Sequence, residues 1–431
     1  MSDLAEPRVL ARPEHPISRQ NISPNALKVL YRLHQRGYKA YLVGGSVRDL
    51  MLGREPKDFD VGTDARPPEM RRLFRNSRII GRRFRLVHVV FQGEVVEVAT
   101  FRGEPDPAQQ GDDDVLITSD NVYGTPRQDA FRRDFTINAL FYDIADFSVI
   151  DYVGGVEDLE RRVVRIIGDP DVRLQEDPVR MMRACEYAGR LGFAIEPATQ
   201  EAIQRHRQKI ELAAPARVTE EVLELLRCGR AGAALQWMLE LGLLEVLLPE
   251  AYAMIGAGAS EASDFSRLLP TIDQAVQEGR RLSDATLLGV LLLPQILQRR
   301  DDVEALDQRP MSRAAIRQLV EEMAEPFIRR FALSKNRTTQ LLHALVGFQR
   351  LLEPQWTPRA RVQMAHRPYF DDALDLFGLL VAATGEGQRA LEQWRSAAAR
   401  RGAPQAAEGR RPGARRRRRR PRRRRRAGGG G

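Results

Sequence analysis

The spacing of apolar residues changes partway along the chain. Before about residue 155, short apolar runs alternate with stretches whose apolar residues recur every three or four positions, which predicts strands alternating with helices. From about residue 171 to about residue 400, only the helical spacing continues, with no convincing strand. The pattern therefore predicts a small α/β domain with a mixed sheet, followed by an all-α region.

Turn residues set the boundaries of the predicted elements. Ser23 followed by Pro24 is typical of a helix start, and Gly37 is typical of the position after a helix end. Residues 104–125, rich in Gly, Pro and Asp, are predicted to form a mobile loop. Helices are expected over residues 24–36, 47–52, 67–74, 127–142, 177–190, 197–208, 219–227 and 231–241, and strands over residues 40–43, 58–61, 78–80, 86–91, 95–101 and 149–152.

The two ends of the chain lack a core-forming pattern. Residues 1–20 hold three prolines and scattered charges, and they are expected to be a disordered leader. Residues 399–431 hold 15 arginines and one acid, Glu408, so this low-complexity segment carries a charge of +14. Because the whole chain carries +10, the first 398 residues carry −4. The globular part is thus mildly acidic, and the tail holds almost all of the basic character.

The remaining composition narrows the class of protein. No run of about 18 apolar residues occurs, and the polar start does not resemble a signal peptide, so a soluble, cytoplasmic protein without membrane contact is expected. Cys185 and Cys228 are far apart, which favours buried structural thiols over a disulfide framework or a zinc site.

The strongest chemical signal is the segment YLVGGSVRDLMLGREPKDFDVGT. A strand leads to Gly44 and Gly45, and the bare backbone at this bend suits the phosphates of a nucleotide. Asp58 and Asp60 follow in a predicted strand, where alternation places both carboxylates on one face. Two carboxylates on one rigid face can hold a pair of Mg²⁺ ions.

Each part of this segment also has an ordinary interpretation. A double glycine is usually a tight turn, two alternating aspartates are usually a solvated strand face, and Arg48 with Asp49 could be a surface pair. Their combination in one G-G-x-x-R-D…D-x-D array favours function, because the phosphate turn and the metal-binding face belong to one unit. Gly44, Gly45 and Arg48 are therefore the nucleotide-binding residues expected in this segment.

With this array, residues 22–250 resemble the poly(A) polymerase and tRNA CCA-adding family, in its bacterial class II branch. The family's next motif is present as RRDFTINA over residues 132–139. Arg133 offers a fork of donors to a phosphate or ribose, and Asn138 can bond a sugar hydroxyl. The resemblance implies that Asp134 is a third catalytic acid. A salt bridge from Asp134 to an arginine is the alternative, and Glu97 is a rival third metal ligand.

A second stretch with candidate functional residues is EDPVRMMR over residues 176–183. Asp177 with Pro178 predicts a capped helix start. The resemblance implies that Asp177, Arg180 and Arg183 contact the adenine or the triphosphate of the incoming nucleotide. Many relatives carry another arginine where this chain has Glu186, which is expected to pair with an arginine of the same helix.

Two features favour polyadenylation over CCA addition. Residues 79–89, IIGRRFRLVHV, resemble the segment that marks bacterial poly(A) polymerases, although a solvated basic hairpin is the simpler interpretation of their charge. The arginine tail binds phosphate backbone without reading sequence, which suits an enzyme that accepts many RNA 3′ ends. A localisation or solubilising role is the alternative for the tail.

The prediction is therefore an α/β nucleotidyltransferase head with a palm-like mixed sheet that adds AMP from ATP to RNA 3′ ends without a template. Two Mg²⁺ ions on Asp58 and Asp60 are the expected cofactors, and RNA-decay proteins are candidate partners besides RNA and ATP. A CCA-adding tRNA nucleotidyltransferase and a catalytically inactive RNA-binding protein are the alternatives. The predicted regions are a disordered leader (1–20), the head (21–155), a helical neck that binds nucleotide and RNA (156–250), a helical body (251–398) and a disordered Arg-rich RNA-binding tail (399–431).

Overall fold

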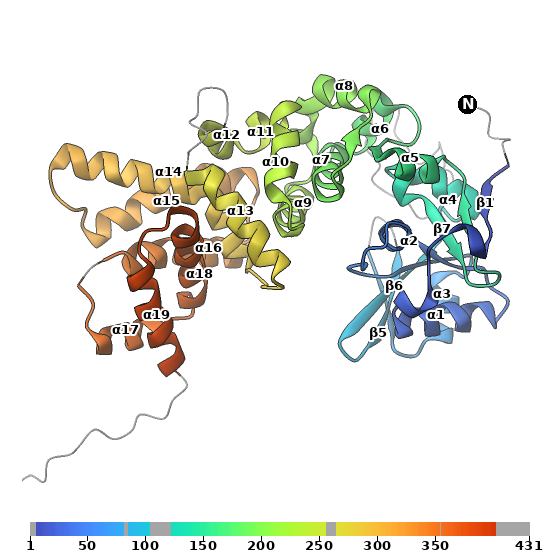
Figure 1. Cartoon of the computed structure of the whole chain (residues 1–431), viewed down its shortest axis with the longest axis horizontal. Helices are drawn as coiled ribbons and strands as arrows, with labels where there is room; N and C mark the ends of the chain where they lie inside the picture. Colours follow the sequence, from blue (N-terminus) through green and yellow to red (C-terminus); the bar gives the residue numbers. More distant parts are fainter. Residues whose placement is uncertain (1–5, 82–84, 104–121, 256–263, 354, 402–431) are drawn as a thin grey trace, which may run out of the picture.

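The computed structural model describes residues 6–81, 85–103, 122–255, 264–353 and 355–401. The predicted mobile loop lies mostly outside these residues, as do Arg82, Arg83 and nearly all of the tail. In Figure 1 an α/β head lies at one end, and the helices of the neck and body extend from it to the other. The predicted fold class is confirmed for the part of the chain that the structure describes.

The head is built on one eight-stranded sheet in the order β1-β8-β7-β2-β3-β6-β5-β4. Among the described strands of this sheet, only β3 and β6 pair in parallel, so the sheet is mixed as predicted. The strands are β1 (Arg8–Leu10), β2 (Ala40–Val43), β3 (Asp60–Thr63), β4 (Ser77–Ile80), β5 (Leu86–Phe91), β6 (Glu94–Thr100), β7 (Leu140–Asp143) and β8 (Val149–Asp151).

Helices cover both faces of the head sheet. The buried face of α1 (Pro24–His34) packs on one side of β2, β3 and β6, and Ser23 caps this helix as predicted. On the other side a small separate core forms around Tyr41, Phe101 and Phe141. The further helices of the head are α2 (Gly45–Met51), α3 (Pro67–Leu73), α4 (Pro126–Arg132) and α5 (Gly155–Arg161).

Three expectations for the head are wrong. Residues 6–20 are not a disordered leader, because β1 pairs with β8 and Ile17 is buried. The strand predicted over 58–61 begins only at Asp60. The helix predicted over 127–142 ends at Arg132 and is followed by the strand β7. Residues 140–142 are fully buried between β2 and β8, and a short apolar run of this kind has no period that separates strand from helix.

The described residues of the neck and body are helical, apart from a two-stranded parallel pair of β9 (Val163–Val164) and β10 (Ala194–Ile195). No strand was expected in the region of β10. The neck comprises α6 (Pro170–Glu176), α7 (Arg180–Leu191), α8 (Pro197–His206), α9 (Pro215–Arg227), α10 (Ala231–Glu240), α11 (Leu243–Leu247) and α12 (Pro249–Ile255). The body comprises α13 (Asp264–Gln277), α14 (Asp284–Asp307), α15 (Arg313–Arg330), α16 (Lys335–Leu351), α17 (Pro358–Ala365), α18 (Phe370–Thr384) and α19 (Gln388–Arg400).

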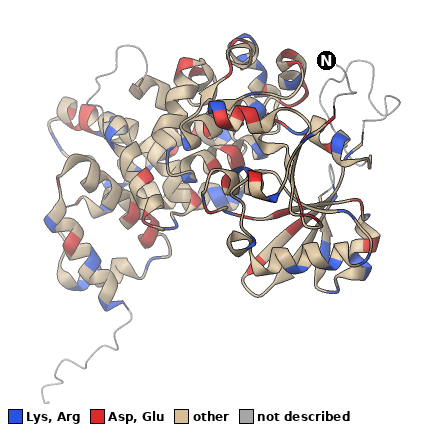
Figure 2. Ribbon diagram, turned by 45° about the vertical axis from the view of Figure 1, so that its right-hand side comes forward, with Lys and Arg blue, Asp and Glu red and all other residues tan. Residues whose placement is uncertain are grey.

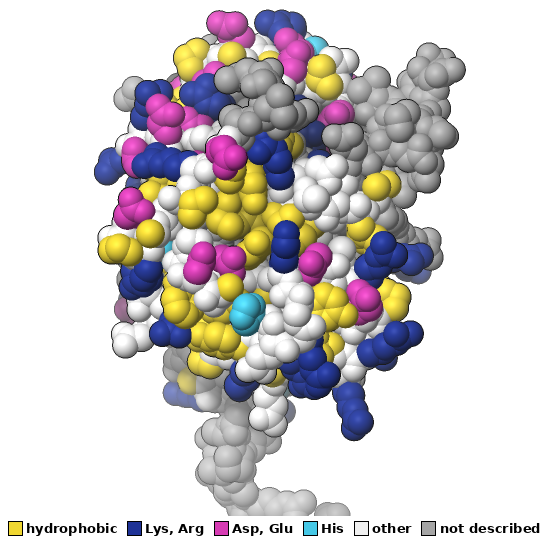
Figure 3. All heavy atoms as spheres, turned by 90° about the vertical axis from the view of Figure 1, so that its right-hand side faces the viewer, with side chains coloured by type: hydrophobic (Ala, Val, Ile, Leu, Met, Phe, Trp, Pro, Cys, Tyr) yellow, Lys and Arg dark blue, Asp and Glu magenta, His cyan; other side chains and the backbone are white. Residues whose placement is uncertain are grey.

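The surface of the head end does not segregate charge. Figure 3 shows this face, where hydrophobic side chains gather near the centre and Lys, Arg, Asp and Glu are scattered around them. None of the described helices is long and apolar enough to cross a membrane.

Candidate active site

The double-glycine bend lies where an arginine and an aspartate converge. Gly44 connects β2 to α2 with a φ of 74°, a conformation that favours glycine. A Cβ atom on Gly44 would lie 3.2 Å from Nη1 of Arg133 and 3.9 Å from Oδ2 of Asp60. The bend therefore leaves a bare backbone beside one guanidinium and one carboxylate.

Strand register explains why Asp60 reaches this bend. In the antiparallel pair of β2 and β3, Asp60 lies opposite Val43, the residue before Gly44. In the parallel pair of β3 and β6, Asp60 lies beside Glu97. The exposed Asp58 lies just before β3. The register thus brings the second aspartate and Glu97 to the edge of the glycine bend.

Electrostatics show that these carboxylates influence one another. Burial raises the pKa of Asp60, and the charges of Asp58 and Glu97 raise it further. Arg133 acts in the opposite direction, and the net result is a pKa of about 7. Carboxylates that repel one another in a partly buried place favour a bound cation, because the cation stabilises their charged forms. The arrangement is consistent with the predicted role of Asp58 and Asp60.

The donor set fits a magnesium ion that completes its shell with substrate. Among the residues that the structure describes, no three carboxylate, imidazole or thiol side chains gather closely enough to enclose a metal. Mg²⁺ is usually held by one or two carboxylates together with phosphate oxygens and water. Glu97 is also hydrogen-bonded, at 2.9 Å, to Nε2 of His88.

Arg133 is held in place by a buried acid that sequence analysis missed. Nε and Nη2 of Arg133 donate to Oδ2 of Asp129 at 3.0 and 2.9 Å, and Nε of Arg102 donates to Oδ1 at 2.8 Å. Burial alone would raise the pKa of Asp129, but the two guanidinium charges outweigh it and lower the pKa to about 2. Asp129 lies on α4, four residues before the C-cap Arg133, and this spacing was the available signal.

Arg48 lies beneath the bend and is bonded within the chain. Its guanidinium makes two bonds to Asp49, of 2.8 and 3.0 Å, and donates to Oδ1 of Asn138 at 2.5 Å. Only 2% of Arg48 is exposed, and a Cβ atom on Gly45 would lie 3.3 Å from its Nη2. These contacts show Arg48 supporting the glycine bend, and its contact with nucleotide stays a prediction.

Asp134 forms the salt bridge that the sequence left open as an alternative. Its Oδ2 accepts from Nε of Arg183 at 2.8 Å, and its Oδ1 accepts from the amide of Phe135 at 2.8 Å. Burial would raise the pKa of Asp134, but chiefly Arg183 lowers it to about 2. Asp134 is thus a stable anion with a partner of its own, and its catalytic role is not tested by these contacts.

The stretch over residues 176–183 differs from the prediction at Asp177. Asp177 is not the N-cap of α7, whose N-cap is Val179. Instead Asp177 receives a two-pronged bond from Arg217, at 2.8 and 2.9 Å, across 40 residues of sequence. Arg180 is buried and donates to the carbonyl of Arg173 at 2.6 Å and to Glu176 at 3.1 Å.

Tyr187 links the head helix α2 to the neck helix α7. The guanidinium carbons of Arg48, Arg183 and Arg190 lie 5.2, 5.3 and 5.6 Å from the centre of its ring. Glu186 pairs with Arg190 at 2.8 Å, which confirms the expected pairing within this helix. Figure 2 shows acidic and basic residues interleaved along the neck and where it meets the head.

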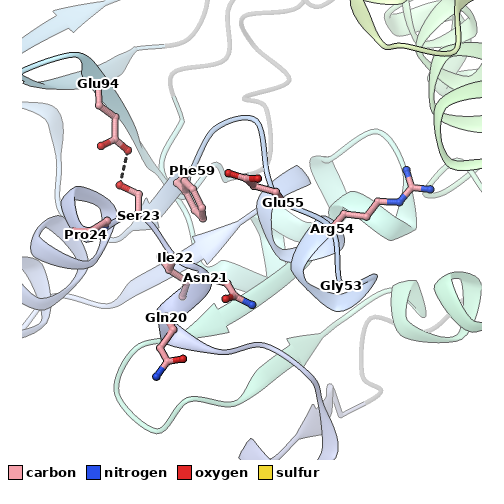
Figure 4. A pocket seen from close by; sticks show the side chains of 10 residues that line it. All are labelled: Gln20, Asn21, Ile22, Ser23, Pro24, Gly53, Arg54, Glu55, Phe59 and Glu94. Carbon is pink, nitrogen blue, oxygen red and sulfur yellow. Dashed lines mark hydrogen bonds between the residues drawn. The ribbon is translucent and has the colours of Figure 1, made fainter. Parts of the chain in front are cut away.

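A separate cavity of 620 Å³ lies on the α1 side of the Asp58–Asp60 segment (Figure 4). Phe59 lines it, and because side chains alternate along the extended chain, Phe59 points away from the side that Asp60 occupies. Glu94, which also lines it, accepts a 2.5 Å hydrogen bond from Ser23. The cavity therefore lies apart from the glycine bend.

Comparison with known proteins matches two family models. Residues 40–165 match the poly A polymerase head domain, and residues 192–254 match a domain described as the probable RNA and SrmB-binding site of polymerase A. The chain is 40% identical over 397 residues to poly(A) polymerase I of Salmonella typhi, covering 90% of this chain and 84% of that one. Identity to poly(A) polymerase I of Haemophilus influenzae is 34% over 399 residues, covering 90% and 86%.

Sequence matches to CCA-adding enzymes cover only about half of the chain, whereas the structural match covers most of it. The Bacillus subtilis CCA-adding enzyme is 37% identical over 223 residues, which is 52% of this chain and 55% of that one. The crystal structure of the Bacillus stearothermophilus CCA-adding enzyme in complex with CTP superposes with a TM-score of 0.61 at 28% identity, covering 88% of this chain and 83% of that one.

Proposed function

The chain belongs to the poly(A) polymerase family, and on this premise we propose that it extends RNA 3′ ends with AMP from ATP, without a template and with release of pyrophosphate. One observation carries the choice of polyadenylation over CCA addition. Similarity to poly(A) polymerase I covers 90% of the chain, whereas similarity to the Bacillus subtilis CCA-adding enzyme covers 52%.

The proposed chemistry is centred on Asp58 and Asp60. The residues fit Mg²⁺, which when bound would lower the charge on the triphosphate and activate the RNA 3′-hydroxyl. The 3′-oxygen attacks the α-phosphorus of ATP, the bond to the β-phosphate oxygen breaks, and pyrophosphate leaves. Asp58 and Asp60 would hold the ions at one edge of the sheet, and Arg133 would donate to a phosphate resting on the bare backbone of Gly44 and Gly45.

We propose Glu97, rather than Asp134, as the third acid of this centre. Glu97 is the strand neighbour of Asp60 and raises its pKa, whereas Asp134 is neutralised by Arg183. His88 would keep the Glu97 carboxylate oriented through its 2.9 Å hydrogen bond.

Base recognition is proposed for the start of α7. Asp177 can accept from the amino group of adenine, and its bond from Arg217 fixes the orientation of the carboxylate. Arg180 and Arg183 are proposed to contact the base or triphosphate after exchanging their present partners, Glu176 and Asp134.

The arginine tail is proposed to bind RNA without sequence preference. Eleven of its arginines lie in two runs, at residues 415–420 and 422–426. Such a segment binds phosphates, and its affinity falls steeply with salt. RNA-decay proteins remain proposed partners, and the cytoplasm remains the proposed location.

An incorporation assay tests the function. Purified protein with Mg²⁺ is incubated with a generic RNA, or with a tRNA lacking its 3′ end, and each single nucleoside triphosphate. Long A tails on the generic RNA are expected. Addition of only C and A to tRNA would instead indicate a CCA-adding enzyme. The Asp58→Ala variant is expected to lose incorporation and keep RNA binding, and a wild-type protein that binds RNA but incorporates nothing would contradict the proposal.

A further inference from the structure

A basic groove lies between α17 and α19, at the far end of the body. It encloses 480 Å³, and its charged side chains are Arg361, Arg389 and Arg400 against one acid, Glu392. Gln393 and Ser396 add neutral polar groups. The groove therefore presents three positive charges and one negative charge to a ligand.

Arg361 is held in the groove by an aromatic ring. Its guanidinium carbon lies 5.6 Å from the ring centre of Trp394, which is only 1% exposed and is fixed by a 3.1 Å bond from its Nε1 to the carbonyl of Leu351. Nε of Arg361 is buried and has no hydrogen-bond partner in the part of the chain that the structure describes. Stacking on Trp394 fixes the position of the guanidinium, and a guanidinium fixed in this way can bind an anion.

The groove arginines differ from many others in the body. Arg313, Arg317 and Arg329 each pair with a glutamate. Neither Arg389 nor Arg400 has an ion pair among the described residues. The three groove arginines thus keep their full charge for a ligand, whereas the others are neutralised within the chain.

The position of the groove excludes contact with the incoming nucleotide. Figure 1 shows α17 and α19 at the opposite end of the molecule from the head. The groove also lies outside residues 192–254, which match the RNA-binding family model. In sequence, α19 runs directly into residues 402–431, which contain 13 further arginines.

We propose that this groove binds the phosphate backbone of the substrate RNA well upstream of its 3′ end, an inference that rests on the proposed function. A polyanion matches the excess of unpaired guanidiniums, and the RNA is already tethered to the protein by its 3′ end in the head. The chain's own arginine tail is excluded as the occupant, since like charges repel. An acidic protein segment could also pair with these arginines, but it would not already be bound to the protein at a second site, as the RNA is through its 3′ end.

The test compares two triple variants of the full-length protein. One carries Arg361→Gln, Arg389→Gln and Arg400→Gln. The control carries Arg309→Gln, Arg317→Gln and Arg329→Gln, which removes the same charge from exposed, ion-paired positions. Affinity is measured by fluorescence anisotropy with RNAs of about 8 and about 40 nucleotides, the shorter being within the site size of one single-strand binding module.

The groove variant is expected to bind the longer RNA about tenfold more weakly and to reduce the slope of log affinity against log salt by about 2, as the loss of three phosphate contacts implies. Binding and adenylation of the shorter RNA should stay unchanged, and the control should resemble wild type. If the groove variant and the control variant bind the longer RNA with equal affinity, the proposal is overturned. Binding of an acidic peptide to the groove would not change that conclusion. If the triple variant unfolds, the double variant of the exposed Arg389 and Arg400 serves instead. A wild-type protein that adds no AMP to either RNA would refute the proposed function. That result is distinguishable from failure of the groove proposal, which is measured by RNA affinity.

Discussion

The head–neck junction and the far end of the body are both rich in arginine, but they use it differently. At the junction Arg133, Arg183 and Arg217 each bond a carboxylate. In the groove between α17 and α19, Arg361 and Arg389 have no carboxylate partner among the described residues. Charge is therefore neutralised where the nucleotide is proposed to bind and left available at the other end.

This difference matches the two tasks that we propose for these regions. An arginine held by a carboxylate has a fixed orientation, so it can present donors to a nucleotide with defined geometry. An arginine without a carboxylate partner keeps its charge available to any phosphate, which gives affinity for RNA of any sequence. The variants below test whether geometry and affinity separate in this way.

The largest expected effect is that of Asp60→Asn on catalysis. Removing this charge should lower AMP incorporation by about a thousandfold, or ~4 kcal/mol of transition-state stabilisation, because a proposed metal ligand is lost. Affinity for a long RNA should not change, since the groove and the tail are intact. The Asp64→Asn variant serves as the control in a single-turnover assay, because Asp64 is exposed and lies just after the opposite end of this strand. Weaker RNA binding by Asp60→Asn would show that the two regions are not separable.

A comparison of Glu97→Gln with Asp134→Asn identifies the third acid. We expect Glu97→Gln to lower kcat about a hundredfold with little change in stability, because Glu97 is partly exposed and lies beside Asp60. Asp134→Asn should lower the melting temperature more and kcat less, since it leaves the Arg183 charge without its main partner. The reverse pattern, with a stable but inactive Asp134→Asn, would return the catalytic role to Asp134.

The sequence predicted the centre of this site because its parts are local. A strand, a glycine bend, a short helix and a second strand follow within about 25 residues, and a hydrogen-bonded antiparallel pair brings the ends of such strands together. The chemistry of the residue types then left few alternatives for Asp58 and Asp60. The element boundaries were predicted less accurately, since the strand expected over residues 58–61 begins only at Asp60.

The missed features depend on contacts between distant residues. Arg217 reaches Asp177 across 40 residues, and no local period connects them. The edge strand β1 looked like a leader because its three residues become a strand only by pairing with β8, about 140 residues later. The run Leu140–Tyr142 is buried on both faces, so its periodicity could not separate a strand from a helix.

Acid should weaken the head through Asp129. Its pKa is lowered from 3.8 to about 2 in the folded protein, so its ion pairs stabilise the fold fully above about pH 4, and this stabilisation is lost between pH 4 and pH 2. Asp129→Asn should therefore lower the free energy of unfolding by about 2 kcal/mol at pH 7, and the difference from wild type should shrink towards zero near pH 2. Urea unfolding at several pH values measures this difference. A difference that stays constant down to pH 2 would show that packing, rather than charge, holds Arg133.

The smallest effect is expected from Arg217→Lys. Lysine keeps the charge but cannot make the two parallel bonds that now fix the Asp177 carboxylate, so Asp177 should keep its place and lose its defined orientation. The KM for ATP should rise about threefold, and the preference for ATP over GTP and CTP should fall by a similar factor, with kcat nearly unchanged. The matched control is Arg205→Lys, because Arg205 pairs with the partly exposed Asp171 outside the site. Unchanged selectivity in Arg217→Lys would mean that the bonds from Arg217 to Asp177 do not set the geometry of base recognition. The contrast between paired and unpaired arginines would then concern stability alone.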